Sequence, residues 1–396
     1  MRRLAALGIA CLALSGGLGA AERYLILPFH NASGAANLDW IGEAFAEAAR
    51  EALEAHGVPV VPRSERERAA RRLGLPLDRA LLKGSLIRLG MEAQADWIVF
   101  GRFEFSPAPG SGEPARGSIH VRAESLDLKR VMAGPVHEEA APMRELSRLL
   151  GRLAWKLLRD ARPETAPPME EFLERHRPVR LDALENYIRG LLAPELEQKH
   201  RFFALAANLE PEFALPCFEL GRMQWDENNY RAAARWLKRV PPDSSRYLEA
   251  RFLLGLCRYH VGDYERARED FEAVADAVPG PAIFNNLALA WYRTMVPNAV
   301  EALLWAVDRD PEDPDLRFNA GYLLWREGRF AEAASHLEKA LEINPGDVAA
   351  RRLLLRCRKS EGPRRGDLSM EGAERLKEYF EEVAAAPDRA GRGARR

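Results

Sequence analysis

The chain has 396 residues, enough for two or three domains, and its 47% hydrophobic and 30% charged content suits ordinary soluble cores. The formal net charge is −1 at pH 7, so no basic excess points to nucleic acid and no acidic excess points to a solvating tail. We therefore expect a globular, multidomain protein that does not bind nucleic acid.

Residues 1–21 have the pattern of an export signal. Arg2 and Arg3 precede an apolar run over residues 4–14, and small residues follow, with Ala21 just before a predicted cut at Glu22. The apolar run is too short to span a bilayer comfortably. We expect an exported protein, periplasmic or envelope-associated, with membrane association only through an uncleaved signal or lipidation.

Residues 22–160 alternate strand-like and helix-like runs. In chain order, we expect a strand over 23–29, a helix over 38–57, a strand over 58–63, a helix over 64–74, a helical piece around 79–94, strands over 96–106, 118–128 and near 131–140, and a helix over 143–160. This order predicts an α/β domain, a mixed sheet flanked by helices with a parallel part and an antiparallel edge.

The stretch YLILPFHNASGAANLDWIGEAF, residues 24–45, has the outline of a phosphate-binding turn. Gly34 stands alone, however, and neither GxGxxG nor GxxxxGK[ST] occurs. We therefore expect a loop that joins a strand to a helix, with anion binding at the helix start as the alternative.

A Pro-rich stretch, ARPETAPP, opens a predicted linker over residues 161–180. Beyond it, strand-like runs vanish, and alanine, leucine, arginine and aromatic residues recur at helical spacing. The composition therefore predicts a second, all-helical domain over residues 181–358.

The second domain contains an internal repeat. Small residues stand at Gly221, Gly255, Ala288 and Gly321, at intervals of 34, 33 and 33. An alanine follows each of them 11 or 12 residues later, at Ala233, Ala267, Ala299 and Ala333. Three units end on proline, at Pro279, Pro311 and Pro345. This pattern resembles the tetratricopeptide repeat (TPR) family, which implies an α-solenoid of helix–turn–helix units. The unit over 282–311 is one residue short between its helices, and 348–359 is expected to cap the array.

The resemblance implies that the first helix of each unit lines a concave face. The candidate partner-binding residues there are Arg222, Trp225, Phe252, Tyr259, Asn285, Asn286, Tyr292, Arg293, Asn319, Tyr322 and Arg326. Rings with Arg and Asn suit peptide binding, whereas rings at helical spacing also suit a core. We favour Asn286 and Asn319, because a buried stack has little use for amides.

Residues 22–140 carry a second resemblance. LPFHNASG and LDWIGEAFAEAAREAL, then VVPRSE, then ADWIVFGRFE are similar to the α/β domain at the N-terminus of TolB and related domains of bacterial envelope proteins. The resemblance implies a docking module without catalytic activity.

Motifs for chemistry are weak. His137 does not belong to an HExxH motif, and no GxSxG occurs. DRDPEDPD (308–315) is acidic enough for calcium, but Pro311 breaks the EF-hand pattern, so we expect these carboxylates to cap the next helix. Cys217, Cys257 and Cys357 are too widely separated for a disulfide framework, and Cys257 and Cys357 are expected to pack rather than react. No catalytic residue, metal or cofactor is expected.

The chain ends, over 359–396, in a predicted amphipathic helix at 369–383 and a basic, disordered tail, DRAGRGARR. The sequence as a whole predicts an exported, non-catalytic TPR adaptor or scaffold of the cell envelope that binds a protein or peptide partner. A self-assembling structural subunit, and thus a homo-oligomer, is the first alternative. An enzyme or small-ligand site in the α/β domain is the second.

Overall fold

The computed structural model describes residues 22–108, 117–364, 370 and 372–378. The chain divides into two compact units, one ending at Met169 and one beginning at Glu170. The expected signal and the basic tail lie outside the described residues. The expected linker is not irregular throughout, because it contains helix α5 (Met169–Arg175).

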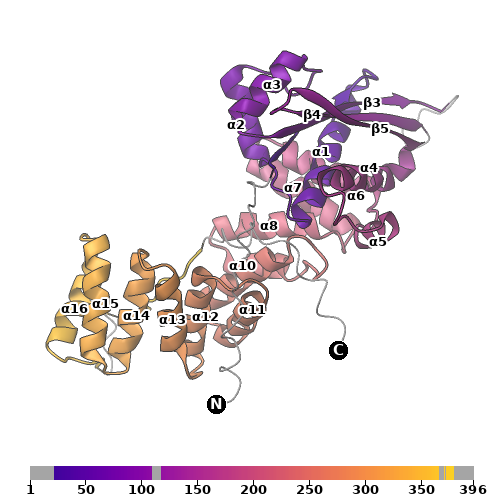
Figure 1. The fold of residues 1–396 in the computed structure, drawn as a ribbon. Coiled ribbons are helices and arrows are strands. Elements are labelled where there is room, and N and C mark those ends of the chain that lie inside the picture. Colours follow the sequence, from indigo (N-terminus) through magenta and orange to yellow (C-terminus); the bar gives the residue numbers. More distant parts are fainter. Residues whose placement is uncertain (1–21, 109–116, 365–369, 371, 379–396) are drawn as a thin grey trace. The chain divides into compact units, whose positions relative to one another are not determined.

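The first unit is built on one mixed sheet (Figure 1). Its strands are β1 (Tyr24–Ile26), β2 (His30–Asn31), β3 (Trp97–Ser106), β4 (Ser118–Asp127) and β5 (Met132–Pro142). The order is β1-β3-β4-β5, with β2 also paired to β3. β1 and β2 run parallel to β3, whereas β3, β4 and β5 form antiparallel pairs. The expected parallel part and antiparallel edge are thus both present.

Helices cover both faces of this sheet. They are α1 (Trp40–Ala55), α2 (Arg63–Leu73), α3 (Lys83–Glu92) and α4 (Leu146–Ala161), with short 3-10 turns at Ala36–Leu38 and Met143–Glu145. Alternate residues of a strand point to opposite faces. On one face, Ile98 joins a buried cluster with Leu86 and Leu89 of α3. On the other, Phe103 lies 6.4 Å, centroid to centroid, from Phe45 of α1.

The loop after β1 brings the chain very close to α1. The Phe29 amide donates to the Gly42 carbonyl at 3.0 Å. A Cβ on Gly42 would lie 2.1 Å from the Phe29 carbonyl oxygen. Glycine is therefore required here for the backbone of the loop to approach the helix.

The expected strand over 58–63 is not formed. Only Val60 makes a bridge, parallel to Tyr24. The Tyr24 amide donates to the Pro59 carbonyl, and the Val61 amide donates to the Tyr24 carbonyl, both at 2.8 Å. On the side that faces β1, Pro59 has no N–H to give, and α2 begins at Arg63, so the pairing does not extend into a ladder.

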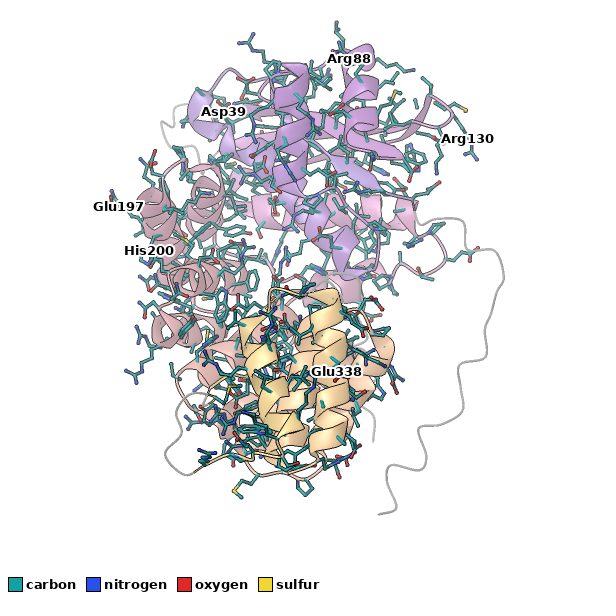
Figure 2. The ribbon with its side chains drawn as sticks, turned by 90° about the vertical axis from the view of Figure 1, so that its left-hand side faces the viewer. Asp39, Arg88, Arg130, Glu197, His200 and Glu338 are labelled. Atoms are coloured by element: carbon teal, nitrogen blue, oxygen red, sulfur yellow. The ribbon has the colours of Figure 1, made fainter. Side chains whose placement is uncertain are left out.

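The second unit is a run of helices in which neighbours in sequence pack against each other (Figure 1). They are α6 (Leu181–Leu192), α7 (Leu196–Leu209), α8 (Ala214–Asp226), α9 (Tyr230–Leu237), α10 (Tyr247–His260), α11 (Tyr264–Ala277), α12 (Pro281–Arg293), α13 (Ala299–Arg309), α14 (Pro314–Arg326), α15 (Phe330–Ile343) and α16 (Val348–Arg358). Charged side chains such as the labelled Glu197 of α7 are exposed (Figure 2).

The repeated glycines stand where paired helices approach most closely. A Cβ on Gly255 would lie 2.7 Å from the Phe271 ring, and one on Gly321 would lie 2.7 Å from Leu337. The small residue at this position is therefore a packing requirement, as the repeat pattern predicts.

One repeat departs from the predicted spacing. Thr294 to Asn298 separate α12 from α13, whereas only Glu327 to Arg329 separate α14 from α15. The turn is thus longer than in the next unit, not one residue short. Ala302, which is buried, takes the place predicted for Ala299, which is half-buried.

No helix among the described residues is both long enough and apolar enough to cross a bilayer.

Gly42→Ala tests the close approach in the first unit. Alanine is the better helix former by about 1 kcal/mol, but its methyl group meets the Phe29 carbonyl, so we expect a net loss of about 1–3 kcal/mol in unfolding free energy. Gly84→Ala in α3 is the control, because no atom lies within 4 Å of its added Cβ. In thermal unfolding of the full chain, the midpoint of Gly42→Ala should lie below that of the wild type, and that of Gly84→Ala should not. A Gly42→Ala midpoint equal to that of the wild type would contradict the constraint.

Candidate functional site

A polar face on α12, α14 and the start of α16 holds a second stretch of this chain. We call residues 372–378 the docked segment. We call the surface beneath it the docking face, which comprises Asn285, Asn286, Arg293, Asp313, Asp315, Phe318, Asn319 and Asp347. The predicted helix over 369–383 is wrong for its described part, because residues 373–378 have no helical structure.

Asparagine side chains hold the backbone of the docked segment. Asn319 accepts from the Arg375 amide at 2.9 Å and donates to the Arg375 carbonyl at 2.7 Å. Asn286 accepts from the Lys377 amide and donates to the Lys377 carbonyl, both at 2.8 Å. Each amide side chain therefore satisfies both backbone groups of one residue.

Asn285 links the two contacts. It donates to the Arg375 carbonyl at 2.9 Å and to Asn286 at 3.1 Å, and it accepts from Asn319 at 2.7 Å. All three asparagines have 0% exposure, with the docked segment in place. Buried amides are costly unless they are hydrogen-bonded, and here the ligand backbone completes their bonding.

This pattern explains why the segment is extended. In a strand, the N–H and C=O of one residue point to the same edge, and residues two apart share that edge. Arg375 and Lys377 are two apart, and each presents both groups to an asparagine. A helix would turn these groups along its own axis and leave the asparagines without partners.

Acidic residues at the starts of two helices face the basic side chains of the segment. Arg375 lies 3.0 Å from Asp315 and 2.7 Å from Asp347. Lys377 lies 2.6 Å from Asp313 and 2.9 Å from Asp315. Asp313 also caps α14, as expected from the DRDPEDPD stretch, by accepting from the Asp315 amide.

A basic residue faces the acidic side chain of the segment. Arg293, the last residue of α12, lies 2.8 Å from one Glu374 oxygen and donates to the other at 2.9 Å. The Glu374 side chain is only 2% exposed. Arg375 also lies over the Phe318 ring, 3.7 Å from its centroid, in a cation–π contact.

The chain leading to the segment is also tied to the repeats. The Trp325 indole donates to the Glu361 carbonyl at 2.7 Å, and the Tyr322 hydroxyl donates to the Met370 carbonyl at 3.0 Å. The burial of Tyr322 raises the pKa of its hydroxyl, which therefore stays a donor at neutral pH.

The predicted site residues fall into two groups. Those that contact the segment or Met370 are Asn285, Asn286, Arg293, Asn319 and Tyr322. The other six take no part in these hydrogen bonds, and of these Arg222 and Arg326 are exposed. Phe252 is fully buried edge-on against Phe271, Trp225 lies beside Tyr230 and His260, and Tyr259 packs edge-on on Tyr264. Arg326 lies over the Tyr292 ring, and Arg222 over the Phe218 ring.

Sequence reasoning missed Asp313, Asp315 and Asp347 as contact residues. It assigned the first two only to helix capping. The available signal was positional: Asp313 and Asp347 are both N-cap residues, of α14 and of α16. Carboxylates that recur at the N-caps of neighbouring helices predict an acidic edge on the surface that these helices form.

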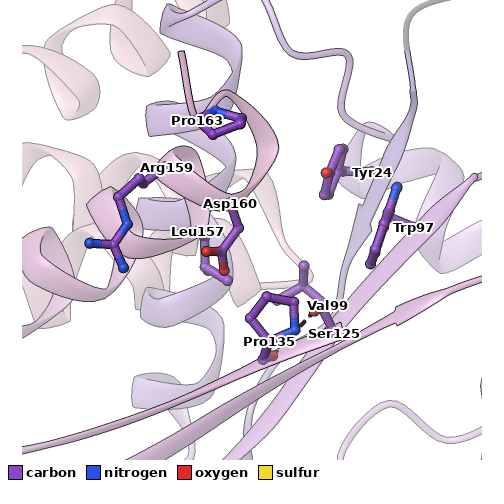
Figure 3. A pocket seen from close by; sticks show the side chains of 9 residues that line it. All are labelled: Tyr24, Trp97, Val99, Ser125, Pro135, Leu157, Arg159, Asp160 and Pro163. Atoms are coloured by element: carbon purple, nitrogen blue, oxygen red, sulfur yellow. Dashed lines mark hydrogen bonds between the residues drawn. The ribbon is translucent and has the colours of Figure 1, made fainter. Parts of the chain in front are cut away.

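The first unit has a separate cavity of about 380 Å³ (Figure 3). Tyr24 and Trp97 stack at its edge, 6.0 Å between ring centroids, and Asp160 of α4 lines it opposite the strands. His137 and Asp160 form a hydrogen-bonded pair. The Ser125 hydroxyl donates to the Pro135 carbonyl at 3.3 Å, so the serine is not bonded to this imidazole as a nucleophile would be.

The cysteines and acidic clusters offer little chemistry. Cys217, Cys257 and Cys357 are all buried and unpaired by disulfides. Burial raises the pKa of Cys257 to about 12 and that of Cys357 to about 11, which keeps both thiols protonated at neutral pH. Within the described ranges, no three His, Cys, Asp or Glu side chains gather as a metal site would require.

Comparison with known families identifies the helical array. The family model described as "Tetratricopeptide repeat" matches residues 218–282 and 289–348. The second unit contains tetratricopeptide repeats. Six of the eight docking-face residues lie within the TPR match, whereas Asn285 and Asn286 lie between its two matched stretches.

Solved TPR proteins are similar in part. A double mutant of MamA RS-1 is 25% identical, with a TM-score of 0.37, over 41% of this chain and 92% of that chain. MamA from Desulfovibrio magneticus RS-1 is 23% identical, with a TM-score of 0.37, over 41% and 92%. YrrB, described as a TPR protein with an unusual peptide-binding site, is 22% identical, with a TM-score of 0.35, over 40% and 84%. No curated protein matches the chain.

Hydrogen exchange tests the backbone contacts in the TPR array. In the wild type, the Arg375 and Lys377 amides should exchange slowly, because each donates to a buried asparagine. In Asn286→Ala with Asn319→Ala, they should exchange at least about ten-fold faster, since a lost pair of bonds costs about 1.4 kcal/mol or more. Asn344→Ala, at an exposed position, is the control. Unchanged protection in the double variant would contradict the contacts.

Docking should weaken in acid. Burial alone would raise the pKa of Asp315, but the hydrogen bonds and charges of Lys377 and Arg375 outweigh it and lower that pKa. The pKa of Asp347 is likewise lowered, against the effect of burial, chiefly by Arg375. Because these carboxylates are more acidic when docked, their stabilisation is complete above about pH 4 and is lost as pH falls through the lowered values.

The difference in thermal midpoint between wild type and Lys377→Ala measures this contribution. It should stay constant from pH 7 to pH 5 and shrink toward pH 3. A difference that does not change over the whole range would contradict the assignment.

Proposed function

We propose that the protein is a non-catalytic TPR adaptor whose docking face binds an extended peptide through its backbone. The observation that carries this proposal is that Asn286 and Asn319 each pair with both the N–H and the C=O of one residue of the docked segment. Such pairing suits any extended chain, so the asparagines supply affinity and the flanking charges supply selectivity.

The chemistry of the face supports binding rather than catalysis. Its charged side chains are paired with charged side chains of the segment, and its asparagines are hydrogen-bonded to the segment's backbone. TPR proteins bind peptides and proteins, and the docked segment gives the chemical form of such a ligand for this chain.

We also propose that the protein is exported and works in the cell envelope, on the strength of the signal-like composition of residues 1–21. The resemblance to TolB supports a second docking role for residues 22–160. On this proposal the first unit holds one partner or the envelope assembly, while the repeats hold another.

A self-assembling structural subunit is the second candidate. The observation that favours it is that the ligand of the docking face belongs to the same chain, so a second copy offers the identical segment.

Peptide binding to an opened full-length variant tests the proposed function. Arg375→Glu with Lys377→Glu places negative charges against Asp313, Asp315 and Asp347, which should expel the resident segment. A fluorescein-labelled peptide of residues 370–378, MEGAERLKE, should then bind, as measured by fluorescence polarisation.

Adding Asn286→Ala and Asn319→Ala to the opened variant should weaken that binding by at least about ten-fold, because four backbone hydrogen bonds are lost. Asn344→Ala in the same background should leave it unchanged. Absence of any binding to the opened variant would refute the proposed function.

A further inference from the structure

The charges of the docking face are arranged in a fixed order along the ligand. Glu374 meets Arg293 at the end of α12, whereas Arg375 and Lys377 meet Asp313, Asp315 and Asp347 at the starts of helices. Successive side chains of an extended chain alternate in direction. The segment therefore presents its acidic residue to one edge of the face and its two basic residues to the other.

This order is selective because each position is partly desolvated. The Glu374 side chain is 2% exposed, and the Arg375 and Lys377 side chains are 23% and 20% exposed. Exchanging an acidic for a basic residue at any of them would bring like charges together with little water to screen them. Leu376 is only half-buried, and no polar side chain of the face is bonded to it, so its identity matters less.

The resident segment also competes with any other ligand. Thirteen residues, 359–371, separate α16 from it in the sequence, and a ligand that belongs to the same chain has an effective concentration on the order of millimolar. An external ligand binds only the fraction of molecules whose face is open, so its apparent affinity falls by that fraction.

We propose that the external ligand is an extended protein segment in which an acidic residue is followed by Arg, by a residue of any type and by Lys, and that residues 372–378 are the resident segment it must displace. This inference rests on the proposed function and adds the ligand pattern and the autoinhibition. Release of the resident segment is the step that makes the repeats available.

Polarisation titrations on the full chain test both parts. The labelled peptide MEGAERLKE is titrated with wild type, with Arg375→Glu/Lys377→Glu, and with Lys359→Glu/Arg364→Glu. The last variant makes the same charge change at exposed positions that lie outside the docked segment. Arg375→Glu/Lys377→Glu should open the face and tighten binding of the peptide at least ten-fold relative to wild type. Lys359→Glu/Arg364→Glu should bind the peptide as the wild type does.

The ligand pattern is tested on the opened variant with a peptide of the same composition in which Glu374 and Arg375 exchange places. That peptide should bind at least ten-fold more weakly than the native order. Equal binding of the two peptides would overturn the pattern. Equal binding of the native peptide to wild type and to the opened variant would overturn the autoinhibition. Both results differ from failure of the proposed function, in which no peptide binds the opened variant.

Light scattering identifies the source of the resident segment. The inference requires a wild-type mass near 44.4 kDa that does not change on dilution. A larger mass that falls on dilution, and that is absent from Arg375→Glu/Lys377→Glu, would show that the segment docks between copies and would overturn the intramolecular form.

Discussion

The structure of the docking face depends on the need of buried amides for hydrogen-bond partners. Asn285, Asn286 and Asn319 stand on helices whose other inward residues are apolar, and they have no exposure when the segment is present. A neighbouring side chain satisfies part of each amide, and the ligand backbone satisfies the rest. The extended form of the segment, the placement of its charges and its contact with Phe318 all follow from that pairing.

The sequence predicted the architecture well where spacing carries the information. The repeat of small residues fixed the helix pairs, because Gly255 and Gly321 admit a neighbouring side chain where a Cβ would collide. Prediction from the sequence failed where local context overrides a pattern. Residues 58–63 are apolar enough for a strand, but Pro59 lacks the donor that a ladder requires on one side of the bridge, and α2 begins at Arg63 on the other. The turn before α13 is longer than in the next unit, so Ala302 and not the predicted Ala299 takes the buried position.

The site was predictable only in part. Asn286 and Asn319 were distinguished as polar residues in an apolar stack. The extended ligand was not predicted, because residues 369–383 have the periodicity of an amphipathic helix. Nothing in their local sequence shows that distant residues will hydrogen-bond their backbone groups. Helix propensity is a weak preference, and the hydrogen bonds to the asparagines replace those a helix would make. Asp347 was missed because a helix-start carboxylate has an adequate local role in capping.

The asparagines also limit how far a ligand can be held in this way. Asn286 and Asn319 each stand two residues before the small residue of their repeat, Ala288 and Gly321. In the preceding repeat the equivalent residue, two before Gly255, is Leu253, which has no group to offer a backbone. The row of asparagines that bond both backbone groups of a ligand residue, here called the amide ladder, is therefore two residues long, Asn286 and Asn319. A longer ligand that continues toward α10 leaves the ladder there, and beyond that point only its side chains can hold it in register.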